Sequence, residues 1–276
     1  MLGFRKALLT NPKLLIGAAT GLTLGSYLVY NSVNKLEASE GAAIPPEYPW
    51  PHKELAGSYD AAAIRRGYKV YREICSACHG MNEIAFRNLN VAFTEEEIKV
   101  LANQVDVEGE PDSQGEPTTR KAKPFDYMQS PYKNEQAARA MNGGALPPDL
   151  SVIVKGRPHG EDYIFSLLTG YQEPPAGITL REGLYYNAYF PGGAIGMAPP
   201  ISDGAVEFDD GTPATVSQMA KDVTTYLAYC AKPDEEPRKK MGLKVLLSLS
   251  LVIGLSWVHK RFKWSTIKNR TVVFRE

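Results

Sequence analysis

Cysteine is scarce in this chain of 276 residues, which contains only Cys75, Cys78 and Cys230. So few thiols cannot build the framework of several disulfides that stabilises many small secreted domains. No internal repeat is apparent, and no acidic residue precedes Glu37. Apolar residues make up 43% of the chain, an ordinary share for a folded protein with a membrane segment. The fold must therefore rest on a hydrophobic core.

Net charge is absent as well, because 31 Lys and Arg balance 31 Asp and Glu. The balance conceals a strong segregation along the chain. Residues 39–237 hold 29 acidic and 17 basic side chains, a net charge of −12, whereas residues 238–276 carry +9 and residues 1–38 carry +3. Nucleic acid needs a basic surface, so the acidic middle excludes it as a partner. The same charge suits a basic protein partner attracted over long range.

The chemistry of the chain is concentrated in Cys75–His79, which reads CSACH. This CxxCH pattern is the attachment signature of c-type haem. Two thiols three residues apart lie on one face of a helical turn, where each can add to a haem vinyl group, and His79 offers an imidazole nitrogen to the iron. We predict one covalently bound haem c. The alternative is a zinc site that adds Cys230, although zinc ligands usually come as pairs from separate loops.

The second axial ligand decides between an electron carrier and a small-molecule site, since a thioether opposite histidine closes the iron. Met197 is favoured as this ligand. It lies in Pro191–Pro200, where glycines permit close approach to a flat ring and prolines stiffen the loop. The other methionines considered are Met81, tied to the side of His79, Met219, on a helical stripe, and Met128 and Met141, in or near ordinary loops.

Helical periodicity predicts several helices between the CxxCH pattern and the C-terminal apolar run. One helix is expected over residues 61–75, leading directly into the CxxCH pattern. Gly67 within it would let a second helix approach closely. Another helix is expected over residues 161–169, ending at Gly170.

The last helix of the domain is expected to begin near Thr212, as N-cap, with Pro213 at its first position. It should end before Lys232. Residues 103–124 are too polar and too rich in turn residues to be core, and we interpret them as an exposed acidic loop. The apolar stripe of the helix comprises Val216, Met219, Val223, Leu227 and Cys230.

Near the C-terminus, residues 242–258 are apolar apart from Lys244. Basic residues flank this run on both sides, and Trp257 and Trp264 could lie at the membrane interface. We predict one transmembrane anchor over residues 238–262 and a short matrix-side tail over 263–276. A buried core helix is the alternative, but core helices are rarely enclosed by such dense basic clusters.

Residues 1–38 are predicted to be a targeting and sorting presequence that is removed. Arg5, Lys6 and Lys13 precede an apolar stretch from Leu14 to Tyr30. An uncleaved second anchor and a bacterial signal peptide remain alternatives. The haem domain is then expected to occupy residues 39–237.

A further set of segments, which together cover about residues 45–270, is more specific than the haem motif. The segments are Tyr48–Trp50, Ile64–Gly67, Val70–Tyr71, Cys75–His79, Asn142–Leu150, Gly160–Tyr163, Ser166–Tyr171, Arg181–Tyr185, Ala194–Pro200, Asp209–Thr215 and Arg238–Leu243. In these segments the chain resembles the mitochondrial cytochrome c1 family, the haem-bearing subunits of the ubiquinol:cytochrome c oxidoreductase (cytochrome bc1 complex, complex III). Bacterial relatives commonly have an extra disulfide pair, so a single further cysteine favours the mitochondrial form.

The resemblance implies a mostly α fold, a cytochrome c-like haem domain with long loops that is anchored by one C-terminal transmembrane helix. It also implies an electron relay in the mitochondrial inner membrane, with the haem domain in the intermembrane space and the C-terminus in the matrix. A Rieske iron-sulfur subunit would reduce the haem, and basic, soluble cytochrome c would remove the electron. Further partners would be cytochrome b, other subunits of complex III and membrane lipid. Such a chain would not be catalytic alone.

The resemblance also assigns residues around the ring. Arg157 would neutralise a haem propionate, and Pro147 and Pro148 would line the haem. From the residues themselves, Arg157 could equally be an ordinary surface arginine. The histidines outside the motif, His52, His159 and His259, are interpreted as surface or interfacial groups.

Three other functions remain open at this point. A membrane-anchored cytochrome could serve a different oxidase or reductase, without a quinol-oxidising cytochrome b. A haem enzyme or gas sensor would keep its sixth position open and leave Met197 free. A zinc-structured interaction protein would carry no haem.

Overall fold

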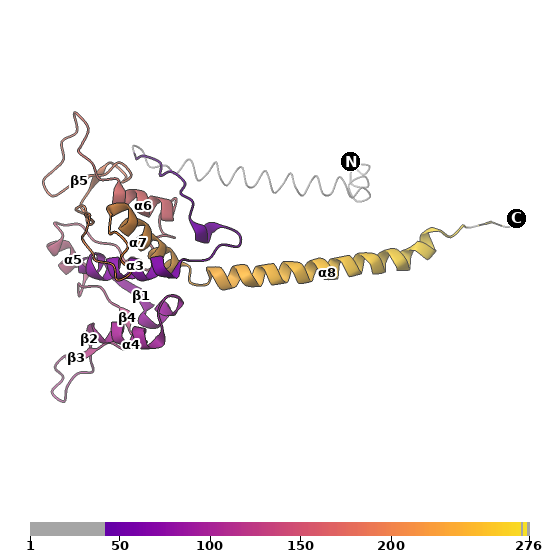
Figure 1. Cartoon of the computed structure of the whole chain (residues 1–276), viewed down its shortest axis with the longest axis horizontal. Coiled ribbons are helices and arrows are strands. Elements are labelled where there is room, and N and C mark those ends of the chain that lie inside the picture. The colour runs from indigo at the N-terminus through magenta and orange to yellow at the C-terminus, as the bar shows by residue number, and fades with distance from the viewer. Residues whose placement is uncertain (1–41, 272, 275–276) are drawn as a thin grey trace.

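The computed structural model describes residues 42–271 and 273–274. The predicted presequence lies outside the described residues. Helices dominate the fold, as predicted, and the long C-terminal helix extends away from a domain of shorter elements (Figure 1). The elements are η1 (Pro51–Lys53), α3 (Ala61–Glu73), η2 (Cys75–Ala77), β1 (Met81–Ala85), η3 (Phe86–Val91), α4 (Glu95–Asn103), β2 (Asp106–Glu108), β3 (Thr119–Lys121), β4 (Tyr127–Met128), α5 (Glu135–Met141), α6 (Glu161–Thr169), β5 (Tyr185–Tyr186), β6 (Ala194–Ile195), α7 (Val216–Ala231) and α8 (Glu235–Lys268).

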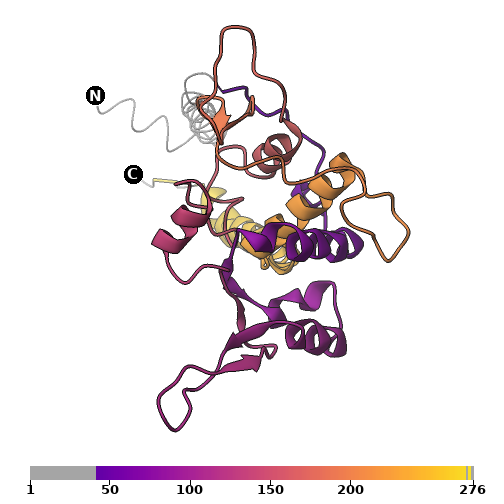
Figure 2. The same ribbon diagram turned by 90° about the vertical axis from the view of Figure 1, so that its left-hand side faces the viewer.

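The packing of α3 against α7 forms the centre of the domain, with α6 on the other side of α7 (Figures 1 and 2). Gly67 makes the contact possible, as predicted. A Cβ atom at this position would lie 2.1 Å from the backbone oxygen of Asp222. The helices can therefore approach until their backbones nearly touch. Fully buried side chains from both fill the core around this point, among them Ile64, Val70, Met219, Val223 and Tyr226.

The predicted start of α7 was wrong by three residues. The helix begins at Val216, and Thr215 is its N-cap, with the Thr215 side chain accepting a hydrogen bond from the backbone N–H of Gln218 at 3.2 Å. Thr212 instead donates its backbone N–H to the side chain of Asp210. This competing turn satisfies Thr212 outside the helix, so the second threonine of the segment takes the capping role. The predicted end before Lys232 was correct.

The interpretation of residues 103–124 as an exposed loop was incomplete. Strands β2 and β3 form an antiparallel hairpin in which Val107 faces Arg120. Val107 and Ala122 are buried, whereas the tip between the strands is exposed and acidic. Val107 in the middle of β2 and Ala122 just after β3 attach the hairpin to the core. The polarity of the sequence correctly predicted the exposed tip of the hairpin but not its buried base.

A buried ionic cluster joins the N-terminal segment to α6 and α7. Glu161 and Asp162, at the start of α6, are 2% and 6% exposed. Lys53 lies 3.2 Å from Glu161 and 3.0 Å from Asp162, and Lys232 lies 2.9 Å from Glu161. His52 is 2% exposed, with its Nε2 3.5 Å from Glu161, so the prediction that His52 is a surface or interfacial group was wrong. The carboxylate of Glu161 and the stacked ring of Tyr59 enclose the imidazole.

The ionised form of Glu161 should stabilise the domain at neutral pH. Burial alone would raise the pKa of this carboxyl, but hydrogen bonds and charges from His52, Lys232 and Lys53 hold its pKa well below the usual range. Because the folded pKa lies below the unfolded value of about 4.3, this stabilisation is complete above that value and is lost as pH falls further. We expect Glu161→Gln to lower the denaturant midpoint at pH 7 and to flatten its decline on acidification.

Equilibrium denaturation between pH 7 and pH 3 would measure both effects, with exposed Glu54→Gln as the control. An unchanged midpoint in Glu161→Gln at pH 7 would contradict the assignment of stability to this cluster.

Helix α8 is the one helix in the described part of the chain that is long and apolar enough to cross a membrane. Its 34 residues span about 51 Å, more than the roughly 30 Å of a bilayer's hydrocarbon core. Its first turn is tied to the domain, because Tyr59 donates its hydroxyl to Glu235 and Lys239 pairs with Glu235 at 3.1 Å. Beyond this turn the helix extends freely from the domain (Figure 1).

Candidate haem site

The CxxCH segment forms where α3 ends. The helix stops at Glu73, and Cys75–Ala77 continue as a single 3-10 turn. The backbone N–H groups of Cys78 and His79 both donate to the carbonyl of Cys75, at 3.1 and 2.9 Å. This tight turn brings both cysteines and the histidine together. Cys75 and Cys78 are partly exposed and form no disulfide.

His79 is held in a defined orientation. Its Nδ1 lies 2.8 Å from the carbonyl oxygen of Pro148, and the hydroxyl of Tyr71 donates to the backbone oxygen of His79 at 3.3 Å. The Pro148 contact leaves Nε2 as the nitrogen that can bind a metal. Burial lowers the pKa of His79, although the Pro148 carbonyl and Asp149 oppose the shift. The imidazole is therefore neutral at pH 7, the form that coordinates iron.

The segment that carries Pro148 is bound to β1 by a series of hydrogen bonds. The backbone N–H of Leu150 donates to the carbonyl of Gly80 at 2.9 Å. Asp149 accepts from the backbone N–H of Asn82 at 2.8 Å, and Ser151 accepts from that of Glu83 at 3.1 Å. The partner of His79 is thus fixed by the strand that follows the haem motif.

Met197 lies in a loop that approaches the same segment from another direction. A Cβ atom at Gly196 would lie 3.1 Å from the Cβ of Ala145, so the two loops are in close contact. The hydroxyl of Tyr171 donates to the carbonyl oxygen of Met197 at 3.0 Å and holds the loop in place. Met197 itself is partly exposed. Residues 145–148 therefore connect the loop of Met197 with the imidazole of His79.

The other methionines considered are either buried in the core or exposed on the surface. Met81, Met128 and Met219 are buried in the core, and the hydroxyl of Tyr226 contacts the sulfur of Met81 at 3.3 Å. Met141 is 75% exposed at the end of α5. Their surroundings leave Met197 as the methionine beside the segment that holds His79.

The residues assigned from the family occupy different positions. Pro147 is half-buried and Pro148 is exposed, both on the segment that contacts His79. Arg157 is exposed in the loop before α6, and its guanidinium donates to the backbone oxygen of Gly156 at 3.1 Å. The structure brings the prolines to the haem motif but gives Arg157 no hydrogen bond to it among the described residues.

Sequence reasoning missed the role of Tyr171. This tyrosine lies 26 residues before its hydrogen-bond partner, and no local spacing indicates such a contact. The Pro148 carbonyl is likewise a backbone group, 69 residues from His79, so no side-chain pattern could identify it as the orienting acceptor.

The donor set fits a covalently attached haem. Two free thiols can form thioether bonds, and a neutral imidazole and a thioether lie on elements that meet at one segment. Apolar side chains on that segment and just after it are left uncovered, with Leu146 37% and Val152 52% exposed. A flat apolar ring would cover such surface.

The zinc alternative lacks support. Cys230 is buried on α7 with 5% of its surface exposed. Within residues 42–271 and 273–274, no group of three or more His, Cys, Asp and Glu could hold a metal ion. The fourth ligand required by that interpretation is therefore not assembled with the CxxCH segment.

A helical domain with this site, followed by one apolar helix, defines a c-type cytochrome with a candidate membrane anchor. Residues 50–267 match the Cytochrome C1 family. The chain is 54% identical over 261 residues to the "Cytochrome b-c1 complex catalytic subunit, mitochondrial" of Candida albicans, with 92% of this chain and 90% of the relative covered. It is 54% identical to "Cytochrome c1, heme protein, mitochondrial" of Saccharomyces cerevisiae (87% and 78% covered) and 48% identical to "Cytochrome c1 2, heme protein, mitochondrial" of Arabidopsis thaliana (93% and 84%).

The chain belongs to the cytochrome c1 family. The resemblance predicted from the motifs is thus confirmed, as is the haem c cofactor predicted from Cys75–His79.

Proposed function

We propose that this chain passes electrons from a Rieske iron-sulfur protein to soluble cytochrome c, through one haem held between His79 and Met197. The broader part of this assignment follows from the family: the chain is a haem-carrying electron-transfer subunit of complex III in a mitochondrial membrane. The observation that supports the finer part is the meeting of two loops at residues 145–148, one of which orients His79 and the other carries Met197.

The bound haem supplies an iron that changes oxidation state by one electron. Cys75 and Cys78 would attach the ring, and the carbonyl of Pro148 orients the imidazole of His79 that would bind the iron. Tyr171 positions the backbone of Met197. Ligands held this firmly change little between oxidation states, which favours fast electron transfer. No group in this site is required to make or break a bond.

Three further residues have proposed contacts with the ring. Pro147 and Pro148 would line it, because their segment contacts His79. Arg157 would neutralise a propionate, since among the described residues its exposed guanidinium donates only to a neighbouring carbonyl and keeps donors available.

The orientation in the membrane follows from charge. Helix α8 begins at the acidic domain and ends in a segment rich in lysine and arginine. We place the domain in the intermembrane space, residues 238–262 in the inner membrane and the basic tail, 263–276, in the matrix. Residues 1–38 would be the presequence and 39–237 the haem domain. Cytochrome b, other subunits of complex III and lipid would surround α8.

Two groups of carboxylates could steer basic cytochrome c. Glu97 is engaged by Arg65 and by the backbone of Thr94, which leaves Glu95 and Glu96 exposed at the start of α4. On the β2–β3 hairpin, Lys121 engages Asp106 at 2.9 Å, whereas Glu108 and Glu110 extend toward the tip.

Two double variants test these groups, Glu108→Gln/Glu110→Gln and Glu95→Gln/Glu96→Gln. We expect at least one of them to slow reduction of cytochrome c by the assembled complex. The rate should fall about threefold to tenfold at low ionic strength and little at 0.2 M salt, because salt screens the attraction of exposed charges. Stopped-flow absorbance over a series of salt concentrations would measure the effect.

Glu54→Gln/Asp234→Asn is a control with the same change of charge, located at the α8 end of the domain. If both test variants kept the wild-type salt dependence, these carboxylates would not be the steering surface. If the control lost as much rate as they did, net charge rather than a docking site would be responsible.

A further inference from the structure

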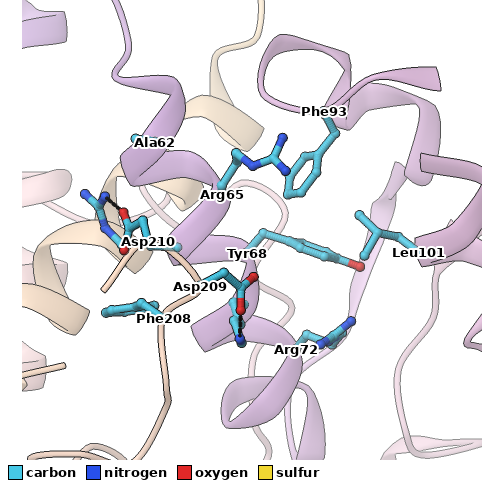
Figure 3. Close-up of a pocket in the computed structure, with 11 residues that line it drawn as sticks. Ala62, Arg65, Tyr68, Arg72, Phe93, Leu101, Phe208, Asp209 and Asp210 are labelled. Carbon is cyan, nitrogen blue, oxygen red and sulfur yellow. Dashed lines mark hydrogen bonds and ion pairs between the residues drawn. The ribbon is translucent and has the colours of Figure 1, made fainter. Parts of the chain in front are cut away.

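A groove on the outer face of α3 is not used by the electron-transfer site (Figure 3). Its volume is about 390 Å³, and α3 forms one wall. Phe93 and Leu101, from the region of α4, form another wall, and the loop of Phe208 closes the third side. Neither the CxxCH residues nor Met197 line it. The groove is thus a separate concave surface.

The groove gathers cations, although the domain as a whole is acidic and each of these cations also contacts a carboxylate. Four cations of α3 line it, against two lining carboxylates. Two of the cations are well satisfied: Arg65 pairs with Glu97, and Arg66 pairs with Asp210 and with Asp222. The lining cations are Arg65, Arg66, Lys69 and Arg72.

The other two cations are held weakly. Lys69 pairs at 2.6 Å with Asp209, whose side chain is 90% exposed. Arg72 donates to the neutral amide of Gln104 at 2.7 Å and reaches Glu73 only at 3.4 Å. Such exposed contacts contribute little and are readily exchanged. Lys69 and Arg72, one turn apart on α3, are therefore available to an incoming anion.

An unpaired hydroxyl lies beside these cations. Tyr68 is 3% exposed, and its ring packs against Phe93 and Tyr226. Its hydroxyl group extends into the groove toward Leu101 (Figure 3) and has no hydrogen-bond partner among the described residues. Burial raises the pKa of Tyr68 to about 12, so the hydroxyl keeps its proton. The hydroxyl oxygen itself is accessible in the groove, where it can donate its proton to a ligand.

We propose that this groove binds a phosphate-bearing anion, with Lys69 and Arg72 contacting the phosphate oxygens and the Tyr68 hydroxyl donating to one of them. A guanidinium fork, an ammonium and a neutral hydroxyl suit a group with several acceptor oxygens and more than one negative charge. Binding would displace the exposed carboxylate of Asp209 from Lys69 and would compete with the contacts of Arg72 with Gln104 and Glu73. The volume is that of a small-molecule pocket, whereas a stable protein interface needs about 800 Å² on each partner.

The test is direct binding to the assembled, haem-loaded complex in detergent. Equilibrium dialysis with radiolabelled ATP, and separately with radiolabelled inorganic phosphate, would be done at constant ionic strength. We expect saturable binding to the wild type, weakened about tenfold in each of Lys69→Gln, Arg72→Gln and Tyr68→Phe. Tyr68→Phe retains the ring and its packing. Lys99→Gln, an exposed lysine of α4 outside the groove, should bind as the wild type does.

The outcomes separate the possible occupants. Binding of ATP much tighter than that of phosphate would assign a nucleotide, and equal binding would assign a free phosphate group. Binding that persists unchanged in all three groove variants would overturn the proposal. So would the absence of saturable binding of either probe, including the case in which a glutamate-rich peptide binds instead and marks a protein-docking surface. The measurement does not involve electron transfer, so its result is independent of the proposed ligands of the haem.

Discussion

Met197→Leu will retain the covalent haem but lose the absorption band of a thioether-to-iron bond at the red end of the oxidised spectrum. The reduction potential will fall by on the order of 0.2 V, because a thioether stabilises the reduced iron and axial ligands set potentials over about 0.8 V. The reduced variant will bind carbon monoxide, since leucine cannot occupy the sixth position. Spectroscopic redox titration of the purified complex, with a pyridine haemochrome assay for haem content, measures all three.

Met141→Leu is the matched control, because Met141 is an exposed methionine at the end of α5. Its spectrum and potential should equal those of the wild type. An intact thioether band in Met197→Leu would show that another group closes the iron. A wild-type chain that binds carbon monoxide readily would favour the open-site haem protein over the electron relay.

Gly67→Ala will destabilise the domain strongly. The added Cβ would meet the backbone oxygen of Asp222 at 2.1 Å and the Cβ of Tyr226 at 2.7 Å, so α3 and α7 must separate. Such overpacking costs about 3 kcal/mol, against roughly 1 kcal/mol that alanine gains over glycine within a helix. We expect a net loss of about 2 kcal/mol in the free energy of unfolding. Denaturant titration of the haem-loaded chain in detergent, followed by circular dichroism, measures it.

Gly156→Ala tests whether the effect belongs to the helix contact. A Cβ at Gly156 would lie 3.6 Å from its nearest neighbours, an ordinary van der Waals distance. This variant should change stability by less than about 1 kcal/mol. Equal stability of Gly67→Ala and the wild type would mean that the helices adjust without cost, contrary to the close packing described above.

Short sequence patterns correctly predicted several helices. Residues 161–169 form the expected helix, since its boundaries depend on a short apolar repeat and on Gly170. The apolar run near the C-terminus lies within a helix, α8, that is fully exposed over the run. The prediction of where α7 starts was wrong because Thr212 and Thr215 are both threonines and are equally suitable as an N-cap. Only the competing bond from Thr212 to Asp210 distinguishes them.

The burial of His52 could not be predicted from its residue type and its nearest neighbours. Its immediate neighbours Pro51 and Lys53 are exposed, although Trp50, two residues earlier, is buried with its ring near the imidazole. The imidazole is also covered by Tyr59, seven residues later in the chain, and by Glu161, which is more than a hundred residues away. A histidine is enclosed here because distant charges and an aromatic ring meet around it.

The sequence alone indicated the class of the protein and the expected mode of haem attachment, because the CxxCH pattern of Cys75–His79 is contiguous. A site built from neighbours in sequence can be read from sequence. Three groups could be found only in the folded chain: the carbonyl of Pro148 beside His79, the hydroxyl of Tyr171 on the loop of Met197, and the hydroxyl of Tyr68 in the groove, which has no hydrogen-bond partner among the described residues. Each depends on segments that become neighbours only when α3 packs on α7 and the long loops close over them.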